Sequence, residues 1–285
     1  MIEILKAPAH LVVQDNGFCG QRHIGIPRAG AMDQAALALG NSLVGNHPQS
    51  AAMEWGVSAG AIRFSEDTRI ALTGAHVHGR RGQLSLTMNI AVDVPGGTTL
   101  EVDRFLTGRF LYIAVSPGLK VEPVRGSLST YLAAGIGGFN GRRLKTGDSI
   151  PQSGFVELFA DTVASRPDYR QTALRIIPGP QHGVLNGSLL RYLTGSEFTV
   201  SRTSDRTGYR LEGPAIDVSG LGQILSEPAC EGAIQVTDSG TPIVLMADGP
   251  TIGGYNKIAV VTGDDLPILA QKTPGEKVRF ALTRI

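Results

Sequence analysis

The sequence predicts a mainly β protein in which two related β-barrels carry only a few short helices. Short apolar runs are separated by turn signals along the chain, glycine is plentiful with 37 residues, and the two halves of the chain resemble each other. A closed barrel suits many short strands because closure removes exposed sheet edges. The clearest predicted strands are apolar runs that end in turns, at 69–75, 110–118, 241–249 and 256–265.

The internal repeat consists of three pairs of segments that occur in the same order. In the longest pair, 53–74 and 226–247, a Glu precedes Gly-Ala-Ile, and an apolar strand follows an acidic turn. We therefore predict two related β units, 1–168 and 169–285. The stretch from about 104 to 170 has no counterpart and extends the first unit. The other two pairs are 25–33 with 208–217, and 95–102 with 274–282.

One segment, 33–43, breaks the strand pattern and is predicted to be a helix of the first unit only. Asp33 can cap its N-terminus, and the Ala, Leu and Gln residues that follow favour a helix. Gly45 and Asn46 can close its C-terminus. This is the only helix that the sequence pattern itself indicates.

Composition excludes several classes of protein. The 285 residues have a formal net charge of +1 with acids and bases interspersed, and 42% are hydrophobic, so we expect a substantial core and no footprint for nucleic acid or anionic membrane. No apolar run approaches the roughly 20 residues that span a bilayer, and no signal peptide is evident. Cys19 and Cys230 are far apart and are expected to be reduced thiols, which predicts a cytoplasmic protein.

His76 and His78 are the best candidates for metal ligands. They lie on one face if 74–81 is a strand. No third ligand is evident in the sequence, so we interpret them as a solvent-facing pair and predict no metal site.

Several motifs of common enzyme classes are absent, which includes CxxC, HExxH and the P-loop. Residues 135–142, GIGGFNGR, lack the strand–helix context of a dinucleotide site, so we interpret them as a wide loop that a ligand or a neighbouring chain approaches. The cations Arg142, Arg143 and Lys145 lie at the end of this loop. They either bind an anion or face solvent, and solvent is the favoured interpretation.

The second unit carries most of the polar turns, and we place the main site there. Residues 246–257, MADGPTIGGYNK, join an apolar strand to a turn that contains Asp248 and Tyr255. Gly253 and Gly254 can adopt positive φ or let another molecule approach the main chain. A tight hairpin turn is the alternative interpretation.

Three further segments supply polar side chains to the predicted site. Gln181 follows two prolines as a fixed amide, and Gln235 is expected on the strand after the turn that begins near Ser226. Arg210 lies close in sequence to the Asp205–Arg206 pair. Such a pair either stabilises a loop or positions an arginine that binds a substrate carboxylate through two hydrogen bonds.

These motifs together resemble one family, that of KipA or allophanate hydrolase subunit 2, which includes the C subunit of 5-oxoprolinase and biotin-dependent carboxyltransferases. The segments that carry the resemblance run in the family's order over nearly the whole chain: QDNG (14–17), GIPRAGAMD (25–33), NSLVGN (41–46), GSLSTYLAAGIGGFNGR (126–142), RIIPGPQ (175–181), SDRTGYRLEG (204–213), SEPACEGAIQV (226–236) and PIVLMADGPTIGGY (242–255).

The resemblance implies two cyclophilin-like β-barrels and a heteromer with a KipI-like partner, which resembles allophanate hydrolase subunit 1. With a third subunit that resembles lactam-utilisation proteins, such a pair forms an ATP-dependent 5-oxoprolinase that opens 5-oxoproline to glutamate. One alternative is a carboxyltransferase that moves a carboxyl group from biotin to urea or a related amide. The other is a regulatory protein that antagonises a KipI-like kinase inhibitor. The chain has no P-loop and no biotin-attachment Met-Lys-Met, so we expect neither chemistry from it alone.

The sequence departs from the family pattern at three positions. Phe18 and Leu128 stand where the family usually has arginine, and Ile252 stands where it usually has threonine. The loss of two arginines weakens the case for the family's anion site in the first unit. The motifs of the second unit are nearly complete.

We therefore predict a pocket beside the turn at 248–255 that holds a flat amide-bearing molecule. Urea, the ureido ring of biotin and the lactam of 5-oxoproline each need a donor for the carbonyl oxygen and an acceptor for the N–H. Such a donor stabilises the oxyanion character that develops on the carbonyl. The predicted catalytic residues are Asp248, Gln235 and Tyr255, and the predicted substrate-binding residues are Gln181, Arg210, Ser226, Thr251, Gly253 and Gly254.

Overall fold

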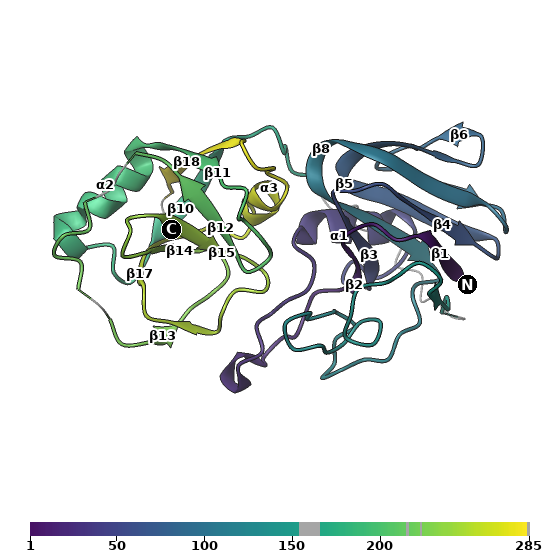
Figure 1. Ribbon diagram of the computed structural model, residues 1–285, viewed down its shortest axis with the longest axis horizontal. Helices are drawn as coiled ribbons and strands as arrows, with labels where there is room; N and C mark the ends of the chain where they lie inside the picture. The colour runs from purple at the N-terminus through teal and green to yellow at the C-terminus, as the bar shows by residue number, and fades with distance from the viewer. Residues whose placement is uncertain (154–165, 215–216, 223, 284–285) are drawn as a thin grey trace. The chain divides into compact units, whose positions relative to one another are not determined.

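A computed structural model describes residues 1–153, 166–214, 217–222 and 224–283 of the chain (Figure 1). It contains two compact units, Met1–Cys19 with Ala29–Arg166 and Gly20–Arg28 with Pro167–Ile285. The domain ranges 1–168 and 169–285 remain a prediction, and they do not anticipate that residues 20–28 pack with the second unit. Residues 154–165 of the predicted extension and 215–216 of the predicted repeat lie outside the described residues.

The described part of the first unit is a nine-stranded sheet that forms a half-barrel. The longest strand, β8, pairs along one edge with β5, and its other edge is shared between β4 and β3. The sheet order is β2-β3-β8-β4-β1-β9, with β5 added beside β8 and with β6 and β7 each paired to β5. The strands are β1 (Ile2–Lys6), β2 (Leu11–Gln14), β3 (Ala52–Gly56), β4 (Gly60–Phe64), β5 (Thr68–Arg81), β6 (Leu84–Ser85), β7 (Ala91–Val94), β8 (Thr99–Ser116) and β9 (Ser149–Ile150).

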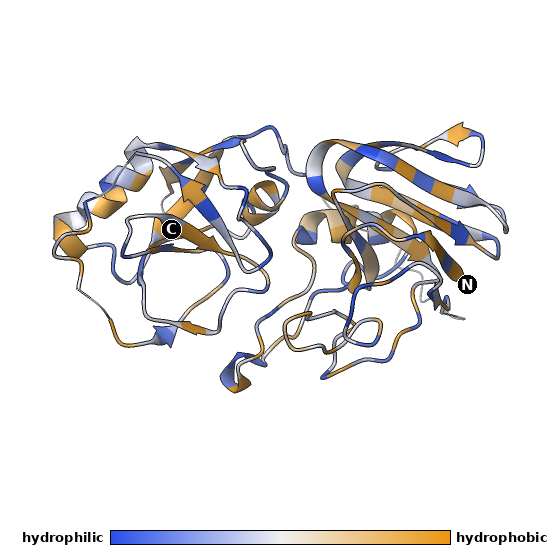
Figure 2. Cartoon of the chain, viewed as in Figure 1, coloured by the Kyte–Doolittle hydropathy of each residue, from blue (hydrophilic) through white to orange (hydrophobic). Residues whose placement is uncertain are grey.

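The core of the first unit lies on one face of this sheet. Trp55, Phe64 and Leu100 are fully buried there, and polar residues alternate with apolar ones along β4 and the first half of β8. Figure 2 shows hydrophobic and hydrophilic residues mixed along these strands. This alternation is typical of a sheet with one face packed and one face in solvent.

The second unit is a closed barrel of seven strands. Its order is β10-β17-β14-β15-β12-β11-β18, and a short separate ribbon pairs β13 with β16. The barrel strands are β10 (Ala173–Pro178), β11 (Glu197–Val200), β12 (Gly208–Glu212), β14 (Ala233–Val236), β15 (Pro242–Leu245), β17 (Asn256–Val261) and β18 (Lys277–Leu282), and the ribbon strands are β13 (Glu227–Pro228) and β16 (Ile252–Gly253).

The helices of the described residues are short. The predicted helix is confirmed as α1 (Gln34–Leu43), which Asp33 caps by accepting the Ala36 N–H at 2.8 Å. Beyond it, the Gly45 N–H donates to Ser42 O and the Asn46 N–H to Asn41 O, which is a Schellman ending. The sequence pattern missed the other elements, η1 (Arg22–Ile24), η2 (Val184–Gly187), α2 (Ser188–Gly195) and α3 (Leu266–Ala270).

The predicted mainly β class is confirmed, and so are the four strands named from apolar runs. The segment alignment behind the repeat, however, does not join equivalent strands. In the first unit β4 pairs with β1 and β8, whereas the aligned β14 pairs with β15 and β17. Short Gly-Ala-Ile strands after a turn therefore recur in different places of the two sheets.

A half-buried carboxylate, Asp15, organises the loops of the first unit. Its side chain accepts hydrogen bonds from the Gly17 N–H, the Ser127 and Ser129 hydroxyls and the Leu128 N–H, at 2.5–2.7 Å. The segments 14–17 and 126–130, which both carry the family resemblance, thus meet around one charge. Hydrogen bonds from several donors satisfy a carboxylate that is partly removed from water.

The Gly-rich loop at 135–142 packs against this same region. A Cβ added at Gly137 would lie 2.0 Å from Ser129 O, and one added at Gly138 would lie 1.8 Å from Thr130 Oγ1. These glycines therefore allow segment 126–130 of the same chain to pack closely against the loop. Our interpretation of the loop as a place where a ligand or another chain approaches is wrong for these glycines.

We predict that Asp33→Ala lowers the free energy of unfolding by about 1–2 kcal/mol, because the Ala36 N–H loses its cap. Asp33→Asn is expected to retain most of the stability, since Asn also caps well. Urea denaturation would measure both. The matched control is Asp103→Ala, whose carboxylate makes only an exposed contact with His78 at 3.1 Å; an equal loss in this control would contradict the capping role.

Candidate functional site

The candidate site lies on the outer face of the second-unit barrel, where the β13–β16 ribbon meets β14. The register places Tyr209, Val244 and Ile234 in one buried row across three strands. The neighbouring row contains Arg210 and Gln235, which therefore point to the opposite, outer face. Gln235 is nevertheless only 4% exposed, so other residues of the unit cover it.

Gly253 of the ribbon lies close to the Gln235 side chain. A Cβ added at Gly253 would lie 2.8 Å from Gln235 Nε2, so only glycine fits without displacing the amide. Gln235 Nε2 is buried and has no hydrogen-bond partner among the described residues. A buried N–H donor without a partner is costly, which makes it the strongest local sign of a place for an acceptor.

Neither Gly253 nor Gly254 has a positive φ. The part of the prediction that invoked positive φ is therefore wrong for both glycines, and close approach to Gln235 is the physical reason for glycine at 253. A Cβ at Gly254 would make only ordinary contacts, 3.4 Å from Ile224 O and 3.7 Å from Ser226 Oγ. The structure thus brings Ser226 and Gly254 together, next to Gly253.

A polar chain runs beside this point and involves two residues of the same segments that are not among the predicted site residues, Glu227 and Lys257. The Gln181 amide donates to Glu227 Oε1 at 2.7 Å and accepts the Lys257 N–H at 2.9 Å. The buried Lys257 Nζ lies 2.6 Å from the same Glu227 oxygen. Hydrogen bonds from Lys257 and then Gln181 lower the pKa of Glu227. The position of Lys257, two residues after the Gly-Gly-Tyr turn, is the sequence signal that could have placed the Lys257–Glu227 ion pair in the predicted site.

Asp248 lies in a second cluster, where it forms a bidentate pair with Arg206. The guanidinium donates to both carboxylate oxygens at 2.8 and 2.9 Å, and both side chains are nearly buried. Asp205 instead accepts from the Thr207 N–H at 2.8 Å. The loop-stabilising interpretation of the arginine is thus the one that the geometry favours, with Asp248 rather than Asp205 as its partner. The catalytic role of Asp248 remains a prediction, and it would require this pair to open.

Residues 20–28 add two arginines to this cluster. Arg22 donates to Ala229 O and, at 3.1 Å, to Pro250 O, which are carbonyls at the ends of the two ribbon strands. Arg28 Nη1 lies 3.3 Å from Glu231 Oε2. Burial raises the pKa of Glu231, although Arg28, Arg206 and Arg22 act in the opposite direction. Sequence spacing gave no signal for Arg22 or Glu231, because their partners are about 200 residues apart along the chain.

A cavity of about 260 Å³ opens beside the ribbon, and Tyr255 and Gly254 line it with Leu221, Gly222, Ile224, Val236, Asp238 and Asn256. Thr251 accepts the Ala229 N–H through its backbone at 3.1 Å, so it fixes the ribbon. Arg210 stands apart: it is exposed on β12, two strands from Gln235. The structure therefore brings together Gln181, Ser226, Gln235, Gly253, Gly254 and Tyr255, and it places Asp248 and Arg210 outside this group.

The other sequence candidates do not form a site in the described residues. His78 contacts Asp103, and His76 contacts Arg166 at 2.8 Å. No group of three or more potential metal ligands occurs in the part of the chain that the structure describes.

None of the described helices has the length and apolar character needed to cross a bilayer. Phe18 is buried and Leu128 packs on the first-unit core, so the two positions that lack the family's arginine serve packing.

Comparisons with known proteins agree on one family. Residues 24–282 match the model of the carboxyltransferase domain, subdomain A and B. The chain is 34% identical over 280 residues to the C subunit of 5-oxoprolinase from Escherichia coli, which covers 98% of this chain and 90% of that protein. It is 30% identical to urea amidolyase of Saccharomyces cerevisiae, of which it spans only 16%. The crystal structure of TTHA0988 superposes with a TM-score of 0.85 at 31% identity, and the chain spans 55% of it.

We predict that the stability contributed by Glu231 depends on pH. Burial raises its pKa in the folded protein above the value of about 4.3 in an unfolded chain, so the folded state holds the proton more tightly. This contribution is present below the unfolded pKa and is lost as the pH rises through the folded pKa. The difference in free energy of unfolding between wild type and Glu231→Gln should therefore shift in favour of the variant as the pH rises from about 4, the pKa of the unfolded chain, through the raised pKa of the folded protein.

Urea denaturation at several pH values would measure this shift. The matched control is Glu212→Gln, which removes an exposed carboxylate from the same unit. A difference between wild type and Glu231→Gln that stays constant with pH would contradict the assignment.

Proposed function

The chain belongs to the carboxyltransferase domain family, and we propose that it is a subunit of an ATP-dependent 5-oxoprolinase with a substrate site beside the β13–β16 ribbon. The main support is the similarity to the Escherichia coli 5-oxoprolinase protein along nearly the full length of both chains. The observation that places the site is the buried Gln235 Nε2 donor without a partner among the described residues, beneath Gly253.

The groups around Gln235 suit an amide or lactam. Gln235 Nε2 can donate to the carbonyl oxygen of such a ligand, and this hydrogen bond strengthens as negative charge develops on that oxygen. The Glu227 carboxylate is partly exposed, at 37%, and can accept from the amide N–H. Lys257 and Gln181 hold Glu227 in place. In this proposal Gln235 polarises the carbonyl, and glycine at 253 avoids the contact that a Cβ would make with the Gln235 amide.

Tyr255 and Ser226 have supporting roles in the proposed site. Tyr255 lines the 260 Å³ cavity beside the ribbon, and Ser226 Oγ lies near Gly254. That volume is at the lower limit of small-molecule sites, which suits a ligand of few atoms. We propose that Asp248 acts by holding the charged Arg206 in place. Proton transfer by Asp248 remains a prediction, and the ion pair with Arg206 disfavours it.

The chemistry of the complex depends on other proteins. We propose a KipI-like protein and a lactam-utilisation-like protein as partners, with ATP used by the complex, because the sequence has no P-loop. A cytoplasmic location fits the free and exposed Cys19 and Cys230.

A second candidate function is carboxyl transfer from biotin to urea or a related amide. The matched family model and the similarity to the yeast urea amidolyase favour it. Urea and the ureido ring of biotin present the same carbonyl and N–H groups to Gln235 and Glu227. A regulatory protein that binds a KipI-like kinase inhibitor is the third, non-enzymatic alternative.

We expect the purified chain alone to show no measurable turnover of 5-oxoproline with ATP, and co-expression with its KipI-like and lactam-utilisation-like neighbours to restore it. The parallel assay supplies urea, bicarbonate, ATP and a biotin carboxylase with its biotinylated carrier. Turnover only in this second assay would favour carboxyl transfer. Partner binding without turnover in either assay would favour the regulatory function, and robust activity of the isolated chain would exclude a dependent subunit.

We predict that Gln235→Leu leaves the stability of the chain unchanged or slightly raised, because it removes a buried donor that has no partner among the described residues. Turnover of the reconstituted complex should fall by about 100-fold, the size of effect seen when one oxyanion donor is removed. Thermal unfolding and steady-state rates measure the two effects separately.

The matched control for this prediction is Gln181→Leu. It removes an amide whose two hydrogen bonds are made, to Glu227 and to the Lys257 N–H. The control should therefore lose about 1–3 kcal/mol of stability. A Gln235→Leu complex that assembles and turns over at the wild-type rate would show that the ribbon is structural only.

A further inference from the structure

The first unit contains a second cleft, far along the chain from the site just described. Its volume is about 490 Å³, within the range of small-molecule sites. One wall is the short connection between β1 and β2, and the other is the segment that follows the Gly-rich loop. The lining residues are Ala7, Pro8, Ala9, Leu132, Gly141, Arg142, Arg143, Leu144, Lys145 and Thr146.

The wall at 141–148 is held in place by hydrogen bonds to β1, to β2 and to the connection between these strands. The Leu144 N–H donates to Leu11 O at 2.8 Å, and the Gly147 N–H donates to Ile4 O at 2.9 Å. The Ala7 N–H donates to Thr146 Oγ1 at 3.0 Å, which connects the two walls of the cleft directly. The cleft is therefore formed by segments whose backbones are fixed, as expected of a site formed before its ligand arrives.

Arg142 is part of this support and is not free to bind an anion. Its guanidinium donates to both oxygens of Asp148 at 2.6 and 2.9 Å and lies over the Phe139 ring, 5.0 Å from its centre. The pair lowers the pKa of Asp148. Our inclusion of Arg142 among possible anion-binding residues is thus wrong, because an ion pair and a ring contact already occupy it.

Arg143 and Lys145 remain as the cations that face the cleft. Neither forms an ion pair with any described residue, although the Lys145 charge acts weakly on Asp148. None of the lining residues is acidic. With Arg142 neutralised by Asp148, the cleft carries two positive charges beside an apolar surface to which Ala7, Ala9 and Leu132 contribute exposed or half-buried side chains.

We propose that this cleft binds a small organic anion, with a phosphate or carboxylate group on Arg143 and Lys145 and an apolar body against Ala7, Ala9 and Leu132. Guanidinium and ammonium groups at a partly enclosed site form charge-assisted hydrogen bonds with such oxyanions. The volume exceeds what an inorganic ion needs, so the apolar wall is expected to add affinity for an organic group. This site is independent of the 5-oxoprolinase proposal, because it lies within the first unit and uses none of the residues around Gln235.

Calorimetric titration of the purified chain tests the proposal with four probes: phenyl phosphate, benzoate, inorganic phosphate and phenol. Phenyl phosphate or benzoate should bind more tightly than inorganic phosphate, and phenol should show no measurable binding. The order of phenyl phosphate and benzoate distinguishes a phosphate site from a carboxylate site. Replacement of both cations, Arg143→Gln with Lys145→Gln, should weaken binding of the better probe by at least 10-fold.

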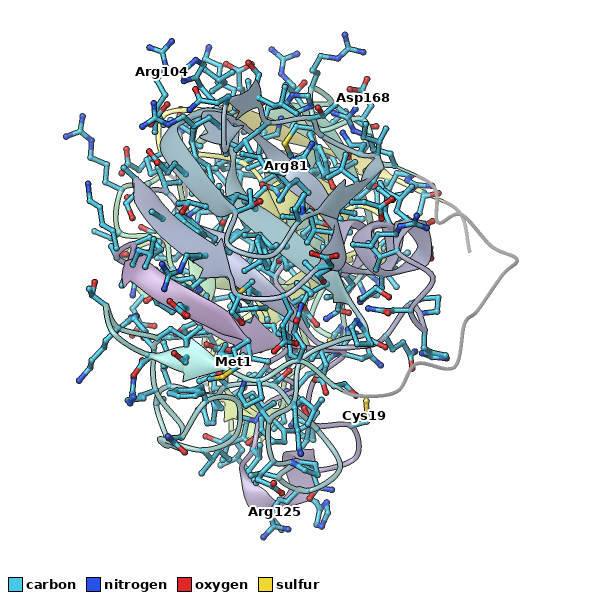
Figure 3. All side chains as sticks on the ribbon, turned by 90° about the vertical axis from the view of Figure 1, so that its right-hand side faces the viewer. Met1, Cys19, Arg81, Arg104, Arg125 and Asp168 are labelled. Atoms are coloured by element: carbon cyan, nitrogen blue, oxygen red, sulfur yellow. The ribbon has the colours of Figure 1, made fainter. Side chains whose placement is uncertain are left out.

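The matched control removes the same charge elsewhere in the first unit, by Arg104→Gln with Lys120→Gln. Both residues are exposed and line no part of the cleft, and Figure 3 shows the Arg104 side chain extending into solvent. This control should bind the probe as wild type does. Ala9→Phe, which fills the cleft without changing charge, should weaken phenyl phosphate and benzoate more than inorganic phosphate.

Three results would overturn the proposal. They are no binding of any probe to wild type, unchanged binding after loss of Arg143 and Lys145, and an equal loss in the Arg104 and Lys120 control. The last result would show a general effect of net charge. Circular dichroism of each variant would confirm that it is folded.

Discussion

The pairing of buried charge determines the loops of the second unit. Arg206 and Asp248 are both nearly buried, and each would be costly without the other. Their bidentate contact joins the loop before β12 to the loop after β15. Glu231, Arg28 and Arg22 extend the cluster, and Arg22 holds carbonyls at the ends of both ribbon strands. The ribbon that covers Gln235 therefore takes its position from charges that have no contact with the proposed ligand.

Two kinds of polar group occur side by side in this unit. Glu227 accepts a hydrogen bond from Gln181 and lies 2.6 Å from Lys257 Nζ, whereas the buried Gln235 Nε2 has no partner among the described residues. Satisfied groups stabilise the fold, and a group left unsatisfied in a folded protein stores free energy that a ligand can release. The same separation occurs in the first unit, where Asp148 and Phe139 hold Arg142 while Arg143 stays available.

Local features of the fold could be predicted from sequence, and features that depend on distant partners could not. The Asp33 side chain caps one end of α1, Gly45 closes the other end because it lacks a side chain and can adopt a positive φ, and apolar runs marked β5, β8, β15 and β17. The bond from Arg22 to Pro250 joins residues 228 positions apart, so no spacing rule could find it. The Gly-rich loop was misinterpreted for a similar reason: sequence shows that glycine permits close approach, but it does not show that the approaching group is Ser129 of the same chain.

The membership of residues 20–28 in the second unit bears on how this protein can change in evolution. A gene fragment that encodes only 167–285 would lack Arg22 and Arg28, so Glu231 would lose its ion-pair partner and two ribbon carbonyls would lose their donor. Recombination therefore cannot transfer the second unit as one continuous piece of DNA without removing part of its support. Natural selection is expected to keep the two units together on one polypeptide, even where gene fusions and fissions rearrange the proteins around them.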